Sequence, residues 1–385
     1  MPKVIVFGNT LQNTMGLIRS IGRSGGKVDL LLEPINKSRC FVRFSKYVNK
    51  VTYLSDIDDA IDVLLREYGN ESIKPVVLCG SDPTISLLDA NYNRLKDKFV
   101  IFNANGEEGR INKYLNKTET FELAEKCGLN LIKTWKVKGG DILPNDIVYP
   151  CFVKGENSVV SGKWDIKVCN TRDEVIGFLR EGVDYLIQEF IRKDAEISLT
   201  GLSWNHGADV FIPGVIKKVR EDLIRMGEFM RLDDTDKYPM INFDGIKKMI
   251  AAIGYEGIFS VDMLIKGTCA YFLEVNLRND GLAYMYTAAG VNFPALWLKY
   301  VSGLLVAEDI SSLSLRTPFY VMHENDMYNI IEGKVSIWQW IRDLHRTNAF
   351  FVLDFSDPMP FIYSTWIHAK QLSKKILRII GTNVG

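Results

Sequence analysis

The chain has 385 residues, of which 47% are apolar and 24% are charged. This is the composition of an ordinary globular protein that can bury about two or three hydrophobic cores. Lysine and arginine together number 47, as do aspartate and glutamate, so the formal net charge is zero. The balance argues against a nucleic-acid partner held by bulk positive charge.

The six cysteines stand apart from one another. They show no Cys-x-x-Cys spacing and have no histidine partners at zinc-finger distances. We therefore expect reduced, mostly buried thiols in a cytoplasmic protein. The apolar run after Lys3 is too short for a signal peptide. No apolar stretch reaches the roughly 18 residues of a membrane span, so no transmembrane segment is expected.

The first part of the chain has the pattern of a parallel sheet covered by helices. Residues 4–7 and 28–32 are apolar runs typical of buried strands, and apolar residues repeat at helical spacing over residues 11–21 between them. This order predicts two parallel strands. The turn at residues 8–10 lacks the glycine pattern of a dinucleotide site, so we expect an α/β domain that binds no dinucleotide.

Another strand and helix follow in the same part of the chain. Residues 75–79 are apolar and lead through Ser81 and Asp82 into a helical stretch, and residues 99–102 predict one more strand. Because the carboxyl ends of parallel strands meet at one edge of a sheet, Ser81 and Asp82 are candidate substrate contacts. The same residues are also typical of a helix start, and we favour helix capping.

A lysine stands at the start of the next predicted helix. Asn116 and Glu119, three residues apart, predict the beginning of that helix, and Cys127 with Gly128 predicts its end. Lys117 lies in the first turn, where the helix dipole favours anions over cations. A phosphate group nearby would explain a lysine at this position.

A second lysine ends the apolar strand at residues 149–154. Lys154 is suited to a point contact with a phosphate group. The loop after it is poor in the glycines whose backbone N–H groups can close over phosphates. Ser158, Ser161 and Lys163 offer further phosphate contacts in this loop.

The middle of the chain has the pattern of several strands. Residues 185–191 form an apolar strand interrupted by Gln188 and Glu189. Residues 198–203 and 209–216 predict a further pair of strands.

Basic residues come directly after this pair of strands. Lys217, Lys218 and Arg220 stand together, and Lys218 is a candidate for neutralising the γ-phosphate of a nucleotide. A solvated, charged turn explains the same pattern. The acidic run at residues 233–236 has no metal-loop spacing, so we interpret it as a loop.

Two strands that fold back on one another form the most informative pattern of the chain. Apolar residues recur at every second position of residues 259–265 and 271–277, which places Leu273 and Val275 on the apolar face. The opposite face carries polar residues of both strands: Asp262, Glu274, Asn276 and Arg278.

The expected register of this hairpin brings two carboxylates together. With a loop at residues 266–270, Ile265 pairs with Tyr271 and Asp262 lies opposite Glu274. Like charges directly opposite in a sheet cost a few tenths to about 1 kcal/mol, a cost that a divalent cation removes. Carboxylate and amide oxygens suit Mg²⁺, which completes its octahedron with phosphates and water. A half-exposed hairpin with ordinary polar residues is the alternative.

These motifs together resemble the ATP-grasp superfamily. Eight residues stand in the order of the family over roughly 160 positions: Lys117, Lys154, Glu189, Glu196, Asp262, Glu274, Asn276 and Arg278. The resemblance covers roughly residues 1–300. It implies an α/β protein in which an ATP-grasp fold with an α+β lid follows a parallel-sheet pre-ATP-grasp domain. Within the superfamily, the opening motifs are most similar to carboxylate-amine ligases of the D-aspartate ligase and carbamoyl-phosphate-synthase-like type.

The resemblance also implies roles for individual residues. ATP would be bound by Lys117, Lys154, Ser161, Gln188, Glu189, Ile191 and Glu196, with Glu196 holding the ribose hydroxyls. Two Mg²⁺ ions, with Mn²⁺ as an alternative, would be held by Asp262, Glu274 and Asn276. Arg278 would contact the acyl phosphate, and Lys218 would act at the γ-phosphate.

The activity implied by the resemblance is ADP-forming ligation of a small carboxylate to an amine, such as an amino acid, through an acyl phosphate. Two alternatives stay open. A phosphotransferase on the same fold would yield a stable phosphorylated product. A degenerate, non-catalytic nucleotide-binding protein is suggested by the glycine-poor loop after Lys154.

We divide the chain into four parts: the pre-ATP-grasp domain at residues 1–111, a first ATP-grasp subdomain with the lid at 112–185, the body with the metal site at 186–303 and an extension at 304–385. The extension matches no assignable pattern, and we expect its basic amphipathic tail to pack on the body rather than lie on a membrane. None of the four histidines is given a catalytic role. The sequence leaves the oligomeric state open, with a homodimer as one candidate.

Overall fold

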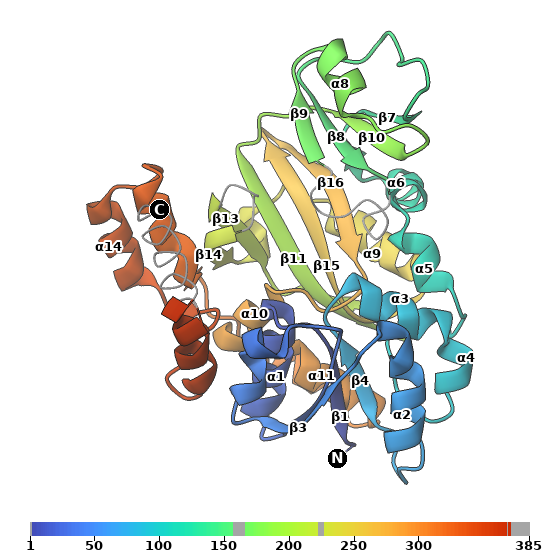
Figure 1. Ribbon diagram of the computed structural model, residues 1–385, viewed down its shortest axis with the longest axis vertical. Coiled ribbons are helices and arrows are strands. Elements are labelled where there is room, and N and C mark those ends of the chain that lie inside the picture. Colours follow the sequence, from blue (N-terminus) through green and yellow to red (C-terminus); the bar gives the residue numbers. More distant parts are fainter. Residues whose placement is uncertain (1, 157–165, 222–226, 368, 371–385) are drawn as a thin grey trace, which may run out of the picture.

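The computed structural model describes residues 2–156, 166–221, 227–367 and 369–370. Within these residues the strands form three sheets, two of four strands and one of ten. Figure 1 shows the parallel sheet in the lower part of the molecule and a small antiparallel sheet at its upper end, with the long strands of the largest sheet between them. The fold class therefore mixes α and β structure, as predicted.

The N-terminal sheet is parallel and has the order β3-β2-β1-β4. Its strands are β1 (Val4–Gly8), β2 (Val28–Leu32), β3 (Val48–Tyr53) and β4 (Val76–Cys79). The helices of this region are α1 (Gln12–Arg23), α2 (Ala60–Tyr68), α3 (Asp82–Ala90), α4 (Tyr92–Leu95) and α5 (Arg110–Leu115). The predicted strand–helix–strand start is confirmed, because β1 and β2 pair in parallel.

The strand predicted at residues 99–102 is wrong. Only Val100 forms a bridge to Val76, and Pro75 has no N–H with which to extend the ladder. The chain instead enters β5 (Asn103–Ala104), which pairs with the largest sheet.

The small antiparallel sheet has the order β7-β10-β8-β9. It is built from β7 (Thr134–Lys138), β8 (Cys151–Gly155), β9 (Ile166–Cys169) and β10 (Asp184–Glu189), with α8 (Arg172–Phe178) packed against it. Trp135, Val153 and Tyr185 belong to a hydrophobic core separate from that of the larger sheets. Ahead of this sheet, α6 (Lys117–Lys126) begins where the Asn116 side chain accepts from two backbone N–H groups, as predicted.

The largest sheet runs in the order β18-β17-β14-β13-β11-β15-β16-β6, with β12 and β5 paired at its side. Its strands are β6 (Asn130–Leu131), β11 (Ala195–Trp204), β12 (Asp209–Phe211), β13 (Val215–Glu221), β14 (Gly227–Asp233), β15 (Tyr255–Lys266), β16 (Cys269–Asn276), β17 (Phe319–Met322) and β18 (Ala349–Phe350), besides β5. The single strand predicted at residues 209–216 is divided into β12 and β13, because Pro213 cannot donate to a ladder.

Helices cover this sheet and continue into the C-terminal part. They are α9 (Phe243–Ile253), α10 (Ala283–Ala289), α11 (Phe293–Val301), α12 (Ala307–Ser311), α13 (Tyr328–Ile331) and α14 (Ile337–Arg346). None of the helices in the described residues is both long and apolar enough to cross a membrane. The six cysteines, all within the described residues, are free thiols, and four of them are buried.

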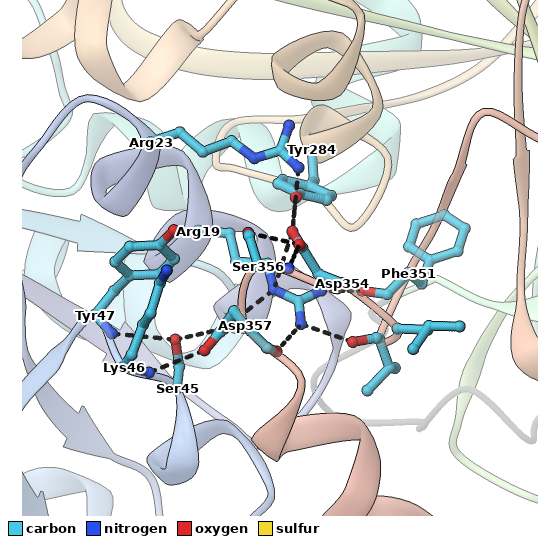
Figure 2. A network of polar contacts seen from close by, with 12 residues as sticks. Arg19, Arg23, Ser45, Lys46, Tyr47, Tyr284, Phe351, Asp354, Ser356 and Asp357 are labelled. Atoms are coloured by element: carbon cyan, nitrogen blue, oxygen red, sulfur yellow. Dashed lines mark hydrogen bonds and ion pairs between the residues drawn. The ribbon is translucent and has the colours of Figure 1, made fainter.

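The C-terminal extension returns to the first helix of the chain. Figure 2 shows the fully buried Arg19 of α1, whose guanidinium donates to the carbonyl oxygens of Phe351 and Val352 at 3.1 and 2.6 Å. The same group donates from Nε to Oδ2 of Asp357 at 3.3 Å. Residues 351–357 are thereby attached to α1, at the edge of the N-terminal sheet. No local pattern indicated this contact, since 332 positions separate Arg19 from Phe351.

Candidate nucleotide and substrate site

A cavity of about 690 Å³ lies between the small antiparallel sheet and the largest sheet. Its walls come from α6, β8, β9, β10, β11, β15 and β16. Seven of the twelve residues predicted for the site line it: Lys117, Lys154, Gln188, Glu189, Ile191, Glu196 and Glu274. Residues more than 150 positions apart in the sequence, such as Lys117 and Glu274, therefore line the same cavity. Ser161 lies outside the described residues.

Two lysines meet at one end of this cavity. Lys117 Nζ donates to the carbonyl oxygen of Gly155 at 3.3 Å. Burial, together with the neighbouring positive charge of Lys117, lowers the pKa of Lys154 to about 8, although Glu274 opposes this effect. Burial also lowers the pKa of Lys117, against the opposing effect of Glu274. Two partly desolvated cations side by side make this end of the cavity a binding site for an anion.

The last residues of β10 line the same cavity. The Gln188 side chain is buried and donates to Thr134 Oγ1 at 2.9 Å, which ties β10 to β7. The backbone N–H of Glu189 donates to the carbonyl oxygen of Lys133 at 3.0 Å. A nucleobase contact at Glu189 would therefore use its carbonyl oxygen. Ile191 follows on the cavity wall.

Glu196 lies on β11 between two lysines. Lys193 Nζ is 2.7 Å from its Oε2, and Lys218 Nζ contacts its Oε1. Burial alone would raise the pKa of Glu196, but the charge of Lys218 and the hydrogen bond from Lys193 lower it below its ordinary value. The carboxylate stays ionised, and a ribose at this position would share it with both lysines.

Lys218 is part of β13 and not of a solvated turn, so that alternative is wrong. Only 13% of its side chain is exposed. Burial acts to lower its pKa, yet the charges of Asp262 and Glu196 raise it above the ordinary value. Lys218 therefore carries a fixed positive charge between the two carboxylates.

In the hairpin of β15 and β16, two carboxylates lie opposite one another as predicted, although the turn has a different register. Ile265 pairs with Ala270, one position earlier than expected, yet Asp262 still lies opposite Glu274. A β-bulge corrects the offset, because Leu273 is an extra residue between the partners of Met263 and Asp262. The bulge turns Leu273 into the cavity wall, so its predicted place on the apolar face is wrong.

The paired carboxylates form a donor set for a hard cation. Burial raises the pKa of Asp262 to about 7, an effect that Lys218 opposes and Glu274 reinforces. The described residues contain no cluster of three or more His, Cys, Asp or Glu side chains of metal-binding arrangement. Two carboxylates with the amide of Asn276 nevertheless fit Mg²⁺, which takes few protein ligands and fills the remaining positions with phosphates and water.

Arg278 joins this hairpin to the N-terminal sheet. Its guanidinium donates from Nε to Oδ1 of Asp82 at 2.5 Å and from Nη2 to Oδ1 of Asn276 at 3.1 Å. Burial acts against the charge of Arg278, but Asp82 keeps its pKa above the ordinary value. A cavity of about 40 Å³ lies here, lined by Asp82 and Asn276 and sharing Lys117 and Glu274 with the larger cavity.

The favoured capping interpretation of the Ser81-Asp82 turn is confirmed for Ser81, and a substrate contact at this turn stays a prediction. Ser81 caps α3, since its Oγ accepts from the backbone N–H of Thr84. Asp82 instead turns its carboxylate to Arg278. Glu33, which the sequence analysis missed, accepts from Ser81 Oγ at 2.5 Å, and burial raises its pKa. Glu33 directly follows β2, so the strand-end rule applied to Ser81 would have found it.

The comparisons with known proteins concern the fold. No protein-family model matches the sequence, and no curated protein matches it. A solved L-amino acid ligase from Bacillus licheniformis superposes with a TM-score of 0.64 at 16% identity, covering 82% of this chain and 77% of that one. The ADP complex of N5-carboxyaminoimidazole synthetase from Staphylococcus aureus gives 0.64 at 15% identity, covering 87% of each chain.

A biotin carboxylase from Campylobacter jejuni, solved with a β-γ-ATP ligand, gives a TM-score of 0.61 at 16% identity and covers 83% of this chain and 74% of that one. At these identities the likeness concerns the fold alone. It agrees with the parallel sheet that precedes the small antiparallel sheet and the largest, mostly antiparallel sheet around the cavity. The chain therefore has the ATP-grasp fold, preceded by a parallel-sheet N-terminal domain, as its sequence predicted.

Proposed function

We propose that the protein is an ATP-dependent, ADP-forming ligase that joins a small carboxylate to an amine through an acyl phosphate. One observation carries the proposal: Lys117, Lys154 and Glu274 line the same cavity as the last residues of β10. A triphosphate lying along this cavity would meet two cations and then a carboxylate pair. The solved L-amino acid ligase and the ADP complex with the same fold support this choice.

The nucleotide would lie with its base near Glu189 and Ile191 and its ribose near Glu196. Lys117, Lys154 and Ser161 would contact the phosphates, and Gln188 would support the nucleotide site beside Glu189. We further propose the division into residues 1–111, 112–185, 186–303 and 304–385, with the nucleotide between the second and third parts.

Asp262, Glu274 and Asn276 would hold Mg²⁺, or Mn²⁺, which when bound offsets phosphate charge and orients the phosphates for transfer. The lysines of this chain complement that effect. Lys218, held between Glu196 and Asp262, adds a positive charge on the γ-phosphate side. Preorganised charges of this kind stabilise a transition state without reorganising during the reaction.

The reaction would proceed in two halves. First, an oxygen of the substrate carboxylate bonds to the γ-phosphorus while the bond from that phosphorus to the bridging oxygen of ADP breaks. Arg278, buried beside Asp82, would hold the resulting acyl phosphate. The amine nitrogen then bonds to the acyl carbon, and inorganic phosphate leaves.

ADP and inorganic phosphate released across pairs of small carboxylates and amines test this proposal. The wild-type protein should release both with a productive pair. E274Q should lower the rate about 100-fold or more, because it removes charge that acts in the transition state. The exposed Glu308 on α12 offers the matched control E308Q, which should keep the wild-type rate.

The alternatives give different products. A phosphotransferase would release ADP without inorganic phosphate, and a non-catalytic nucleotide-binding protein would bind ATP without turnover. Full turnover in E274Q would refute the assignment of the metal site. A cytoplasmic location belongs to the proposal, and light scattering of the full chain would decide between a monomer and a homodimer.

A further inference from the structure

A helix in the C-terminal extension leaves one of its sides exposed. Residues 359–367 and 369–370 are helical. Met359, Ile362 and Trp366 are three and four positions apart, so their side chains lie on the same side of this helix. They are 49%, 53% and 53% exposed. These three side chains are called the apolar stripe below.

The other side of the helix packs on the N-terminal part of the chain. The ring of Tyr363 lies 4.1 Å from that of Phe44, and the Tyr363 hydroxyl donates to the carbonyl oxygen of Ser38 at 3.2 Å. Ile367 is buried. Directly ahead of the helix, Asp357 belongs to the buried network of Figure 2. These contacts fix the orientation of the helix, and they leave the apolar stripe on its outer side.

The segment that contains the stripe is positively charged. Lys370 follows Trp366 by one helical turn, and its Nζ lies 4.9 Å from the centre of the indole ring. Residues 371–385 lie outside the described residues, but their sequence continues the pattern of apolar and basic residues. From residue 358 to residue 385 the chain has no aspartate or glutamate, and it has four cationic side chains: Lys370, Lys374, Lys375 and Arg378. In a chain of zero net charge, this is a local excess of positive charge.

Apolar, tryptophan and basic side chains on one helical segment are typical of a helix that lies in the surface of a bilayer. The apolar side chains enter the boundary between headgroups and acyl chains, and tryptophan prefers the level of the headgroups. Lysine and arginine are attracted to the phosphates of anionic lipids. The strength of binding increases with both the apolar area and the charge. The stripe and the four cations provide both contributions.

A second copy of the chain fits this surface less well. A symmetric dimer brings the same surface of both chains together. The four cations of one chain would then lie close to the four cations of its partner, and like charges repel. An anionic lipid surface instead attracts all four.

The position of the helix is compatible with binding to a surface. Figure 1 shows it in red at the left margin of the molecule, whereas α6, which borders the larger cavity, lies at the right. A bilayer at this margin therefore leaves the cavity accessible to its ligands.

We propose that residues 359–385 bind the protein to the surface of a membrane that contains anionic lipids. The apolar stripe enters the interfacial region, and the four cations lie at the lipid phosphates. This differs from the expectation that the tail packs on the body, because the helix that leads into the tail keeps its apolar stripe exposed. The inference does not depend on the proposed ligase function.

Sedimentation of the full chain with sucrose-loaded vesicles tests this proposal. We expect binding to phosphatidylcholine vesicles with about 30% phosphatidylglycerol and little binding to phosphatidylcholine alone. Binding should weaken between about 0.1 M and about 1 M salt, because salt screens the attraction of the cations.

Two variants test the two contributions separately. W366A removes the largest side chain of the stripe and should weaken partitioning to the anionic vesicles about tenfold. K374Q/K375Q removes two of the four charges and should weaken it about tenfold or more.

Matched controls exist for both variants. I142A replaces an isoleucine that is 92% exposed between β7 and β8. K247Q/K248Q replaces two adjacent exposed lysines of α9. Both controls should bind the vesicles as the wild type does. Urea denaturation shows whether each variant is folded.

The outcomes decide between the possible partners of the stripe. Selective weakening in W366A and in K374Q/K375Q supports the proposal. A wild-type protein that does not bind anionic vesicles overturns it, as do variants that bind like the wild type. A dimer in light scattering that W366A dissociates, without vesicle binding, would show a self-interface instead. A lower free energy of unfolding in W366A, again without vesicle binding, would show that the tail packs on the stripe.

Discussion

Arg278 donates from Nε to Oδ1 of Asp82 at 2.5 Å, although 196 positions separate the two residues. The pair connects the strand that carries the paired carboxylates to the carboxyl edge of the N-terminal sheet. Arg278 is almost fully buried, whereas Asp82 is 28% exposed at its side chain. An acyl phosphate bound by Arg278 would therefore lie beside the groups of that edge.

Replacement of Asp82 should lower the stability of the protein. D82N removes the negative charge that compensates the buried Arg278, and a hydrogen bond to a charged group contributes about 1.5–3 kcal/mol. We expect a loss of that size in the free energy of unfolding, measured by urea denaturation. D62N is the control, because Asp62 pairs with Arg94 at the surface and should change the free energy by no more than about 0.5 kcal/mol. Equal effects of the two substitutions would contradict the importance of the Arg278 contact.

The buried charge of Lys154 should lower the stability of the unliganded protein and increase its affinity for ATP. K154M should raise the Kd for ATP about tenfold or more, the equivalent of one charged hydrogen bond of about 1.5 kcal/mol. Isothermal titration measures this change. K299M, at a half-exposed surface lysine paired with Asp309, should leave the Kd unchanged. Wild-type affinity in K154M would place the phosphates elsewhere.

The pH dependence of stability follows from the same residue. The pKa of Lys154 is lowered from 10.5 to about 8 in the folded chain, so between these values the unfolded state binds more protons. Stability therefore rises with pH from about 8 to 10.5, and the cost of the buried charge is fully present below that window. The difference in unfolding free energy between wild type and K154M should narrow from pH 8 to pH 10. A constant difference would disprove the lowered pKa.

Arg19 should be one of the most costly residues to replace outside the cavity. R19M removes the positive charge paired with the buried Asp357 and the donor of several carbonyl oxygens, and breaking a buried pair typically costs about 3–5 kcal/mol. R23M should cost no more than about 1 kcal/mol, since that arginine is 37% exposed. Urea denaturation of both variants measures the difference, and a small effect in R19M would mean that residues 351–357 are not held by this network.

Asp354 should contribute to acid denaturation. Burial opposes its ionisation, but hydrogen bonds from Ser356 and the charges of Arg19 and Arg23 hold its pKa well below the ordinary value of 3.8. Its contribution to stability is present above that value and is lost as the pH falls below it. D354N should therefore lower stability at pH 7 and flatten its decline in acid, whereas D58N, at an exposed position, should keep the wild-type profile. The unfolding free energy measured from pH 7 to pH 2.5 tests both.

Local patterns in the sequence were sufficient for several parts of this fold. The alternation in residues 259–265 identified the buried face of β15, because the side chains of a strand alternate between its two faces. Asn116 marked the start of α6, since capping is a contact between residues close in sequence. Lys117 and Lys154 were recognised through their neighbours in the chain, and they line one cavity.

Other features depend on contacts that no local pattern records. Alternation alone could not reveal the bulge at Leu273, because inserting one residue changes the face without changing the composition of the strand. The sequence around Lys218 was compatible with a solvated turn. In the structure, however, Lys218 lies between two carboxylates that belong to other strands. The pairs Arg278–Asp82 and His323–Glu228 likewise exist only because the sheets bring distant segments together.

The sequence by itself determined which residues are able to bind a nucleotide and which strand faces are buried, since residue type and periodicity are local properties. Only the tertiary structure decided which charges lie side by side, and charge interactions depend on distance in space and on burial. For this protein, the tertiary structure placed the C-terminal extension against α1, through the contacts of His323 with Gln12 and of Asp357 with Arg19.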